Sequence, residues 1–188
     1  MTAVMRATAR MRQKAGMTRL ALLLLLAAAP AAAQHHPHRH GAPYAGFERR
    51  EVAAFSAQDL ADLRAGRGMA MALPAEVNGH PGPMHALELA DALRLTPEQR
   101  ARMQALMAAM RAEAIPLGEA LIAAERALDA AFRAGPASEA AVEAALREAA
   151  LAQARLRMAH LRTHLATREA LTEAQRADYA RLRGYAPR

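Results

Sequence analysis

The chain has 188 residues, of which 53% are hydrophobic but only 3% aromatic, and it contains no cysteine. This composition excludes disulfides, thiolate catalysis, cysteine-based zinc sites, iron–sulfur clusters and a lipid-modified cysteine anchor. The formal charge is +7, but five cations precede residue 20 and the rest of the chain carries only +2, so we expect no nucleic-acid partner.

Residues 1–33 have the three parts of a secretory signal peptide. A basic stretch that ends at Arg19 is followed by an apolar run, Leu20–Ala29, and by three alanines, Ala31–Ala33, that suit a cleavage site. The apolar run is shorter than the roughly 20 residues of a membrane span. We therefore expect export to the periplasm, cleavage after Ala33 and no stable membrane anchor afterwards.

Residues 34–46 have no apolar periodicity and predict a disordered tail. Imidazole suits Zn, Cu, Ni and Co, and a flexible cluster of histidines binds such ions with modest affinity. The alternative is a solvated tail with only incidental metal affinity. The four histidines of the tail are His35, His36, His38 and His40.

Residues 47–94 predict short helices joined by a loop. Ser56 and Asp59 have the spacing of a capping box, and the helix that they begin should end at Gly66. Residues 78–83 are rich in Asn, Gly and Pro, which favour turns, and a further helix is expected over 84–93.

Residues 95–185 predict an antiparallel hairpin of two long helices. Thr96, Pro97 and Gln99 form a strong helix start, and this helix should run to about Ala134, before Gly135 and Pro136. Apolar residues follow each other in it at heptad spacing, which predicts a packing seam. The seam consists of Met103, Met107, Met110, Ala114, Leu117, Leu121, Ala124, Leu128 and Ala131.

Ser138 can cap the second long helix, which should continue to about Glu169, and Thr172 should begin a final helix that runs to Arg183. The apolar stripe of the second helix is Leu146, Ala150, Ala154, Met158, Leu161 and Leu165. So few aromatic side chains favour such an all-α hairpin with short flanking helices over a thick core. Because the hairpin would leave a wide apolar side exposed, we expect a homodimer.

Two copies of an L-T-x-x-Q motif flank the hairpin. The residues that match the specified positions of the motif are Leu95, Thr96, Gln99, Leu171, Thr172 and Gln175. This arrangement resembles the LTxxQ family of periplasmic proteins. That family includes the Spy- and CpxP-type chaperones and is related to heavy-metal sensor and resistance proteins of the CnrX and ZraP type. The resemblance implies a non-enzymatic, helical, periplasmic dimer that binds unfolded clients or transition metals. The motif residues themselves are expected to cap helices.

His160 and His164 are candidate metal ligands. They are four residues apart on a helix, which puts both rings on one face within reach of one ion. The residues between them lack the glutamate of H-E-x-x-H, so no metalloprotease base is present. Two surface or interface histidines are the alternative, and His80, His85, Glu88 or the tail could complete a metal site.

The methionines allow three interpretations. Thioethers favour Cu(I), but Met is also a core residue and the adaptable residue of promiscuous binding surfaces. Because Met103, Met107 and Met110 occupy the heptad seam, we expect core packing first and a client-binding surface second.

A basic face on the second helix, formed by Arg155, Arg157 and Arg162, is either simply solvated or a surface for acidic segments of clients. No nucleophile elbow, phosphate loop or nucleotide fingerprint occurs, so we expect no enzyme.

These observations favour a metal-responsive periplasmic binding protein that acts in heavy-metal sensing or resistance during envelope stress. The cofactor would be a divalent transition metal, Zn, Ni, Co or Cu. The alternative is a Spy- or CpxP-like chaperone that works without ATP. Expected partners are a second copy of the chain and either unfolded envelope proteins or a membrane-bound regulator.

Overall fold

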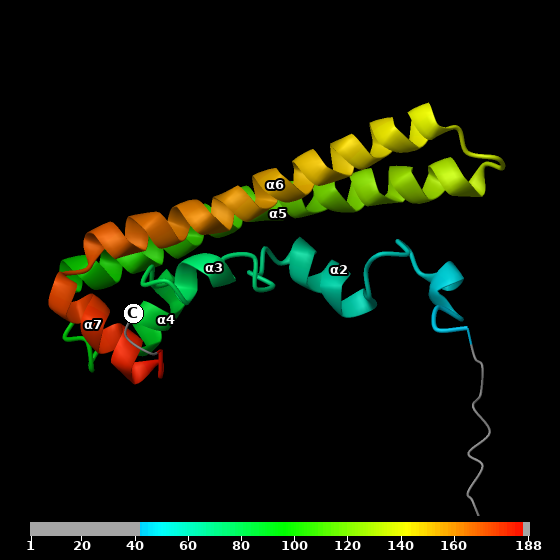
Figure 1. Cartoon of the computed structure of the whole chain (residues 1–188). Coiled ribbons are helices and arrows are strands. Elements are labelled where there is room, and N and C mark those ends of the chain that lie inside the picture. The colour runs from blue at the N-terminus through cyan, green and yellow to red at the C-terminus, as the bar shows by residue number, and fades with distance from the viewer. Residues whose placement is uncertain (1–41, 186–188) are drawn as a thin grey trace, which may run out of the picture. The chain divides into compact units, whose positions relative to one another are not determined.

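The computed structural model describes residues 42–185. The expected signal peptide and the four tail histidines lie outside these residues. Within them, every regular element is a helix, which confirms the all-α prediction (Figure 1). The elements are η1 (Phe47–Arg49), α2 (Ala57–Arg64), α3 (Leu73–Glu76), α4 (Pro83–Glu88), α5 (Pro97–Arg133), α6 (Glu139–Ala170) and α7 (Glu173–Leu182).

Helices α5 and α6 form the long hairpin (Figure 1). Helix α5 has 37 residues and continues through Pro116, and α6 has 32 residues. Thr96 caps α5 with a complete capping box, and the Ser138 side chain accepts a hydrogen bond from the Ala141 amide at the start of α6. Gly135, with φ of +118°, turns the chain between them. The predicted hairpin is therefore confirmed.

The expected packing stripe of α6 is wrong. Leu146, Met158 and Leu165 are exposed, and so are Ala150 and Ala154. The buried face of α6 instead carries small or polar residues, which let the two helix backbones approach closely over a narrow contact. Its members are Ala149, Ala152, Leu156, Ala159, His160, Thr163 and Thr167.

Helix α2 packs against the middle of α5 in the first core cluster. Ser56 and Asp59 form the predicted capping box at its start. Gly118 of α5 permits the contact, because a Cβ there would lie 2.5 Å from the carbonyl oxygen of Leu63. This cluster is formed by Val52, Leu60, Leu63, Ala114, Leu121, Ile122, Ala152 and Leu156.

A second core cluster joins α4, α5 and α7 at the end of the hairpin opposite its turn (Figure 1). Its members are Ala86, Ala90, Leu93, Leu95, Met103, Leu171 and Tyr179. Helix α4 is shorter than predicted, and α3 lies in a segment to which the sequence assigned no element. None of the helices between residues 42 and 185 is long and apolar enough to cross a membrane.

Candidate functional site

The two L-T-x-x-Q motifs meet at the open end of the hairpin. In each motif the threonine side chain accepts a hydrogen bond from the backbone N–H of the glutamine, and the side-chain oxygen of the glutamine accepts one from the backbone N–H of the threonine. The two side-chain amides also bond to each other: Nε2 of Gln99 lies 2.8 Å from Oε1 of Gln175, and the reverse pair is 2.9 Å apart. Both leucines of the motifs are buried. The motif residues thus cap helices, as predicted, and their two glutamines also join the helix ends.

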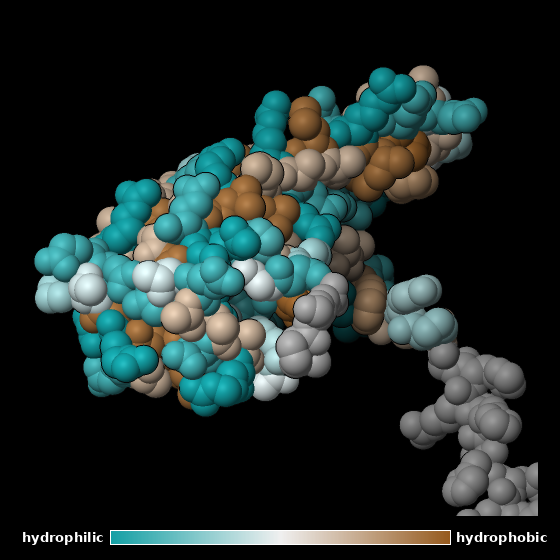
Figure 2. Space-filling view, turned by 60° about the vertical axis from the view of Figure 1, so that its left-hand side comes forward, coloured by the Kyte–Doolittle hydropathy of each residue, from teal (hydrophilic) through white to brown (hydrophobic). Residues whose placement is uncertain are grey.

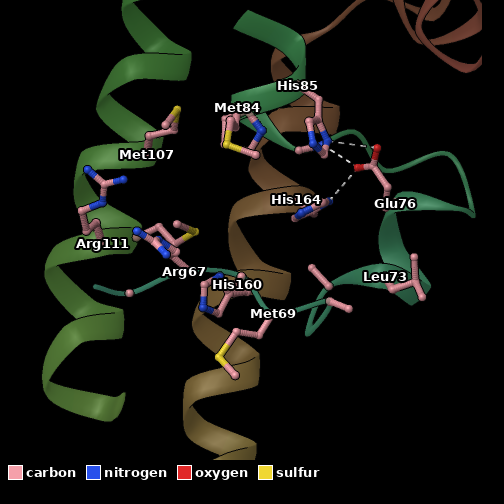
Figure 3. A pocket seen from close by; sticks show the side chains of 17 residues that line it. Arg67, Met69, Leu73, Glu76, Met84, His85, Met107, Arg111, His160 and His164 are labelled. Carbon is pink, nitrogen blue, oxygen red and sulfur yellow. Dashed lines mark hydrogen bonds and ion pairs between the residues drawn. The ribbon is translucent and has the colours of Figure 1, made fainter. Parts of the chain in front are cut away.

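A cavity of about 460 Å³ lies beside this framework, between α4, α5, α6 and the segment 66–76 (Figure 3). Both predicted metal ligands on α6, His160 and His164, line it. Its wall is largely apolar and contains several sulfur and nitrogen donors. The side chains that carry its chemistry are Arg67, Met69, Glu76, Met84, His85, Met107, Met110, Arg111, His160 and His164.

His160 is buried, with 2% of its surface exposed, and its Nε2 has no hydrogen-bond partner among the described residues. Burial, and secondarily the neighbouring His164, lowers the pKa of His160, so the ring is neutral at neutral pH. An unpaired buried nitrogen costs about 1–3 kcal/mol. This nitrogen is therefore a donor that the fold leaves unused.

His164 is held in one tautomer. Its Nδ1 donates a hydrogen bond of 2.8 Å to the carbonyl oxygen of His80, so the neutral ring keeps its lone pair on Nε2. Gly82 leaves room beside that nitrogen, because a Cβ there would lie 3.1 Å from Nε2 and 2.9 Å from Cε1 of His164. The backbone amide of Gly82 also anchors the site through its hydrogen bond to Oε2 of Glu76, at 3.0 Å.

Glu76 lies at one end of the cavity, and both of its oxygens are engaged. The buried carboxylate accepts hydrogen bonds from the hydroxyls of Tyr179 and Tyr185, and His85 Nδ1 and His164 Nδ1 lie 3.4 and 3.6 Å from its oxygens. Burial alone would raise the pKa of Glu76, but the two tyrosine hydroxyls and the two histidines lower it overall. Burial and the carboxylate raise the pKa of Tyr179, which keeps its hydroxyl a donor.

The methionines of α5 separate into two environments. Met103 is fully buried in the second core cluster, as the first of the three interpretations expected, and so does not contribute to a client surface. Met107 and Met110 are half-buried and face the cavity, where Met84 of α4 and Met69 join them (Figure 3). Met69 and the adjacent Ala70 have φ of +42° and +58°, a conformation that L-residues rarely adopt and that often occurs at ligand sites.

The arginines of α6 lie outside the cavity. Arg157 donates a hydrogen bond of 3.1 Å to the carbonyl oxygen of Met71, which ties α6 to the cavity loop. Arg162 pairs with Glu113 of α5 at 2.9 Å. Arg155 is exposed. The basic face therefore has a structural use at two of its three positions.

The cavity suits a metal ion by the chemistry of its donors, but nitrogen and oxygen donors alone do not complete a site. Among residues 42–185 no group of three or more His, Asp or Glu side chains is placed to hold an ion. The thioethers supply the additional donors. The sequence suggested His85 as a possible addition and Met69 and Met84 among the methionines with a possible copper interpretation, but it gave no indication of Glu76, because no periodicity links the segment 66–85 to α6.

Comparisons with known proteins give one finding. No curated protein and no solved structure matches the chain. The family model described as heavy-metal resistance matches residues 65–178, a range that includes the whole cavity, both L-T-x-x-Q motifs and the hairpin. Because this match spans more than half of the 188 residues, the chain belongs to the heavy-metal resistance family.

Proposed function

We propose that the protein is a periplasmic, non-enzymatic binding protein that takes up a transition-metal ion in the cavity and acts in heavy-metal sensing or resistance. The single observation that carries this proposal is the buried His160, whose side chain lines a cavity with further His and Met side chains and whose Nε2 has no hydrogen-bond partner among the described residues. Membership of the heavy-metal resistance family supports it. The signal-like residues 1–33 support export to the periplasm.

His160 and His164 are the ligands that we assign to the ion. Their helical spacing of four residues puts both on one face, and burial keeps the His160 ring neutral, so that it need lose no proton to bind a metal. His164 is oriented by the carbonyl of His80, as a second-shell partner orients a ligand in many metal sites. A bound ion would supply the missing partner of His160. Burial of that ring keeps it neutral and so available at mildly acidic pH.

Calorimetric titration of residues 34–188 with Zn, Ni, Co and Cu tests the proposal. The starting protein carries alanine at His35, His36, His38 and His40, so that the tail cannot bind metal. We call this protein the tail variant. We expect at least one ion to bind with micromolar or tighter affinity. His160→Ala should weaken this binding about tenfold or more, whereas Gln104→Ala, an exposed substitution on α5, should leave it unchanged.

The outcome decides between cavity and tail. If the tail variant binds a metal ion and His160→Ala abolishes this binding, the result supports the cavity as the metal site. Binding that disappears when the tail histidines are replaced would assign the metal affinity to the tail and contradict the proposal. An unchanged metal affinity after His160→Ala would also contradict the proposal.

A chaperone function is a second candidate, which one observation favours. Large apolar side chains are exposed along the hairpin, among them Phe132, Leu146 and Leu151, and Figure 2 shows apolar side chains at the surface between hydrophilic ones. Such surfaces can hold unfolded clients. If the protein works in this way, substoichiometric amounts should suppress aggregation of a reduced, unfolding client without ATP, and no suppression would remove this candidate.

A further inference from the structure

Three methionines from α4 and α5 line the cavity together with the histidines of α6. Met107 and Met110 are one turn apart on α5, and Met84 extends from α4, while His160 comes from α6 (Figure 3). We call Met84, Met107 and Met110 the methionine wall. Thioethers are soft, neutral donors that select Cu(I) and similar ions over Zn or Ni. The donors brought together here are therefore unlike those of a hard or borderline divalent site.

The oxygen donor of the cavity is already occupied. Oε1 of Glu76 accepts hydrogen bonds from Tyr179 and Tyr185, and Oε2 accepts one from the Gly82 amide. A metal would have to displace these partners to bind the carboxylate. This agrees with the absence, within residues 42–185, of any group of three His, Asp or Glu placed around an ion. A divalent ion would thus lack the anionic ligand that usually balances its charge.

The charges around the cavity also favour an ion of low charge. Two guanidinium groups, those of Arg67 and Arg111, belong to its lining, and only Arg67 has its charge balanced by a close carboxylate, Asp62 at 2.5 Å. The repulsion between a bound cation and these two guanidinium groups is proportional to the charge of the cation. A monovalent ion meets half the repulsion that a divalent ion meets, and it loses much less hydration energy in an apolar cavity.

We propose that the cavity binds a soft monovalent ion, Cu(I) or its analogue Ag(I), through thioethers of the methionine wall together with the imidazole of His160. This inference rests on the proposed metal-binding function and specifies the ion and the ligands on α4 and α5. The sequence favoured a divalent ion and raised Cu(I) only as one interpretation of the methionines. Neither sulfur nor neutral imidazole has to lose a proton, so the site forms without anionic ligands.

The test uses Ag(I), supplied as the nitrate in chloride-free buffer, and the protein of residues 34–188 with the four tail histidines replaced by alanine. The variant Met84→Leu/Met107→Leu/Met110→Leu conserves side-chain volume and apolarity, so the fold should persist. We expect it to lower the Ag(I) affinity at least about tenfold and to change the affinity for Zn and Ni less than about twofold. Met158→Leu, at an exposed position on α6 away from the cavity, is the matched control.

A second measurement does not depend on any variant. With methyl-labelled methionine, Ag(I) should shift the NMR signals of Met84, Met107 and Met110 but not those of Met103 or Met158. Unchanged Ag(I) affinity in the triple variant, or shifts confined to methionines outside the wall, would overturn the inference. If His160→Ala still weakened the binding of divalent ions, the proposed function would stand without this inference about a monovalent ion. If neither Ag(I) nor any divalent ion bound the tail variant, the proposed function itself would fail.

Discussion

Glu76 connects the cavity to the C-terminal helix. This carboxylate is only 6% exposed, yet it is bonded to the hydroxyls of Tyr179 and Tyr185 and to the amide of Gly82. A buried carboxylate is stable only when such donors replace its lost hydration. One side chain of α3 therefore fixes the position of α7 and of the loop that precedes α4.

Replacing this carboxylate should destabilise the protein in a pH-dependent way. Glu76→Gln should cost roughly 2–3 kcal/mol at pH 7, because the amide can satisfy fewer of the surrounding donors. Since the pKa of Glu76 is lowered in the folded protein, its contribution is full above the ordinary value of 4.5 and is lost as the pH falls below it. Urea unfolding between pH 7 and pH 3 should therefore show a steeper loss of stability for the natural chain than for the variant.

Glu88→Gln, at an exposed position of α4, is the control and should change the free energy of unfolding by less than about 0.5 kcal/mol. Parallel pH profiles for the natural chain and for Glu76→Gln would show that Glu76 is not the group that titrates.

Gly82 should determine access to His164. Its backbone is extended, with φ of −86°, so alanine fits the conformation, but the added Cβ would contact the imidazole at 2.9 Å. Gly82→Ala should therefore leave the protein folded and weaken metal binding about tenfold or more in the tail variant, as calorimetry would measure. Gly68→Ala is the matched control, since a Cβ there would lie 3.9 Å from His160. Equal effects of the two substitutions would contradict a specific role for Gly82.

At the scale of elements, the paired glutamines hold the helix ends together. Gln99 also donates to the carbonyl of Ala170, and Gln175 donates to that of Leu93, so each side chain serves its own cap and the other helix. The capping role was predictable from sequence, because a capping box is local. The bond between the two glutamines was not, because only the hairpin brings together residues 76 positions apart.

Single and double substitution should reveal this connection. Gln99→Ala and Gln175→Ala should each cost about 1–3 kcal/mol, because each leaves buried or half-buried partners unsatisfied. The double variant should lose at least about 1 kcal/mol less than the sum, since the shared bonds can be broken only once. Urea unfolding of the four proteins measures the coupling, with Gln104→Ala as an exposed control. Strict additivity would mean that the two amides act independently.

The helices themselves were largely predictable, and the face of α6 was not. Caps at Thr96, Ser138 and Thr172 and the turn at Gly135 are local signals, and each lies where the sequence placed it. The stripe of α6 was assigned from apolar residues at helical spacing, with Ala150 and Ala154 between larger ones. The close packing of α5 and α6 instead selects small residues such as Ala152 and Ala159, whose pattern an alanine-rich helix conceals.

At the scale of the whole molecule, only part of the candidate site could be predicted from the sequence. The spacing of His160 and His164 predicts that they share a helix face, and both line the cavity. The other donors come from α3, α4 and the segment 66–72, whose positions depend on tertiary contacts such as the hydrogen bond from Arg157 to Met71. No local pattern encodes that approach, so Glu76 could not be assigned in advance, and Met84 could be suggested as a soft donor but not placed beside the histidines.

Three exposed apolar residues of α6 support the expectation of a dimer. Leu151, Met158 and Leu165 follow one another at heptad spacing and are 44%, 42% and 46% exposed. Such a stripe is the seam of a helix that packs against another helix. We expect sedimentation velocity to show a dimer at micromolar concentration, and Leu151→Gln/Leu165→Gln to give a folded monomer. Leu182→Gln on α7, a similarly exposed leucine, should leave the dimer intact. A monomeric natural chain would leave the stripe free for unfolded clients and so strengthen the chaperone alternative.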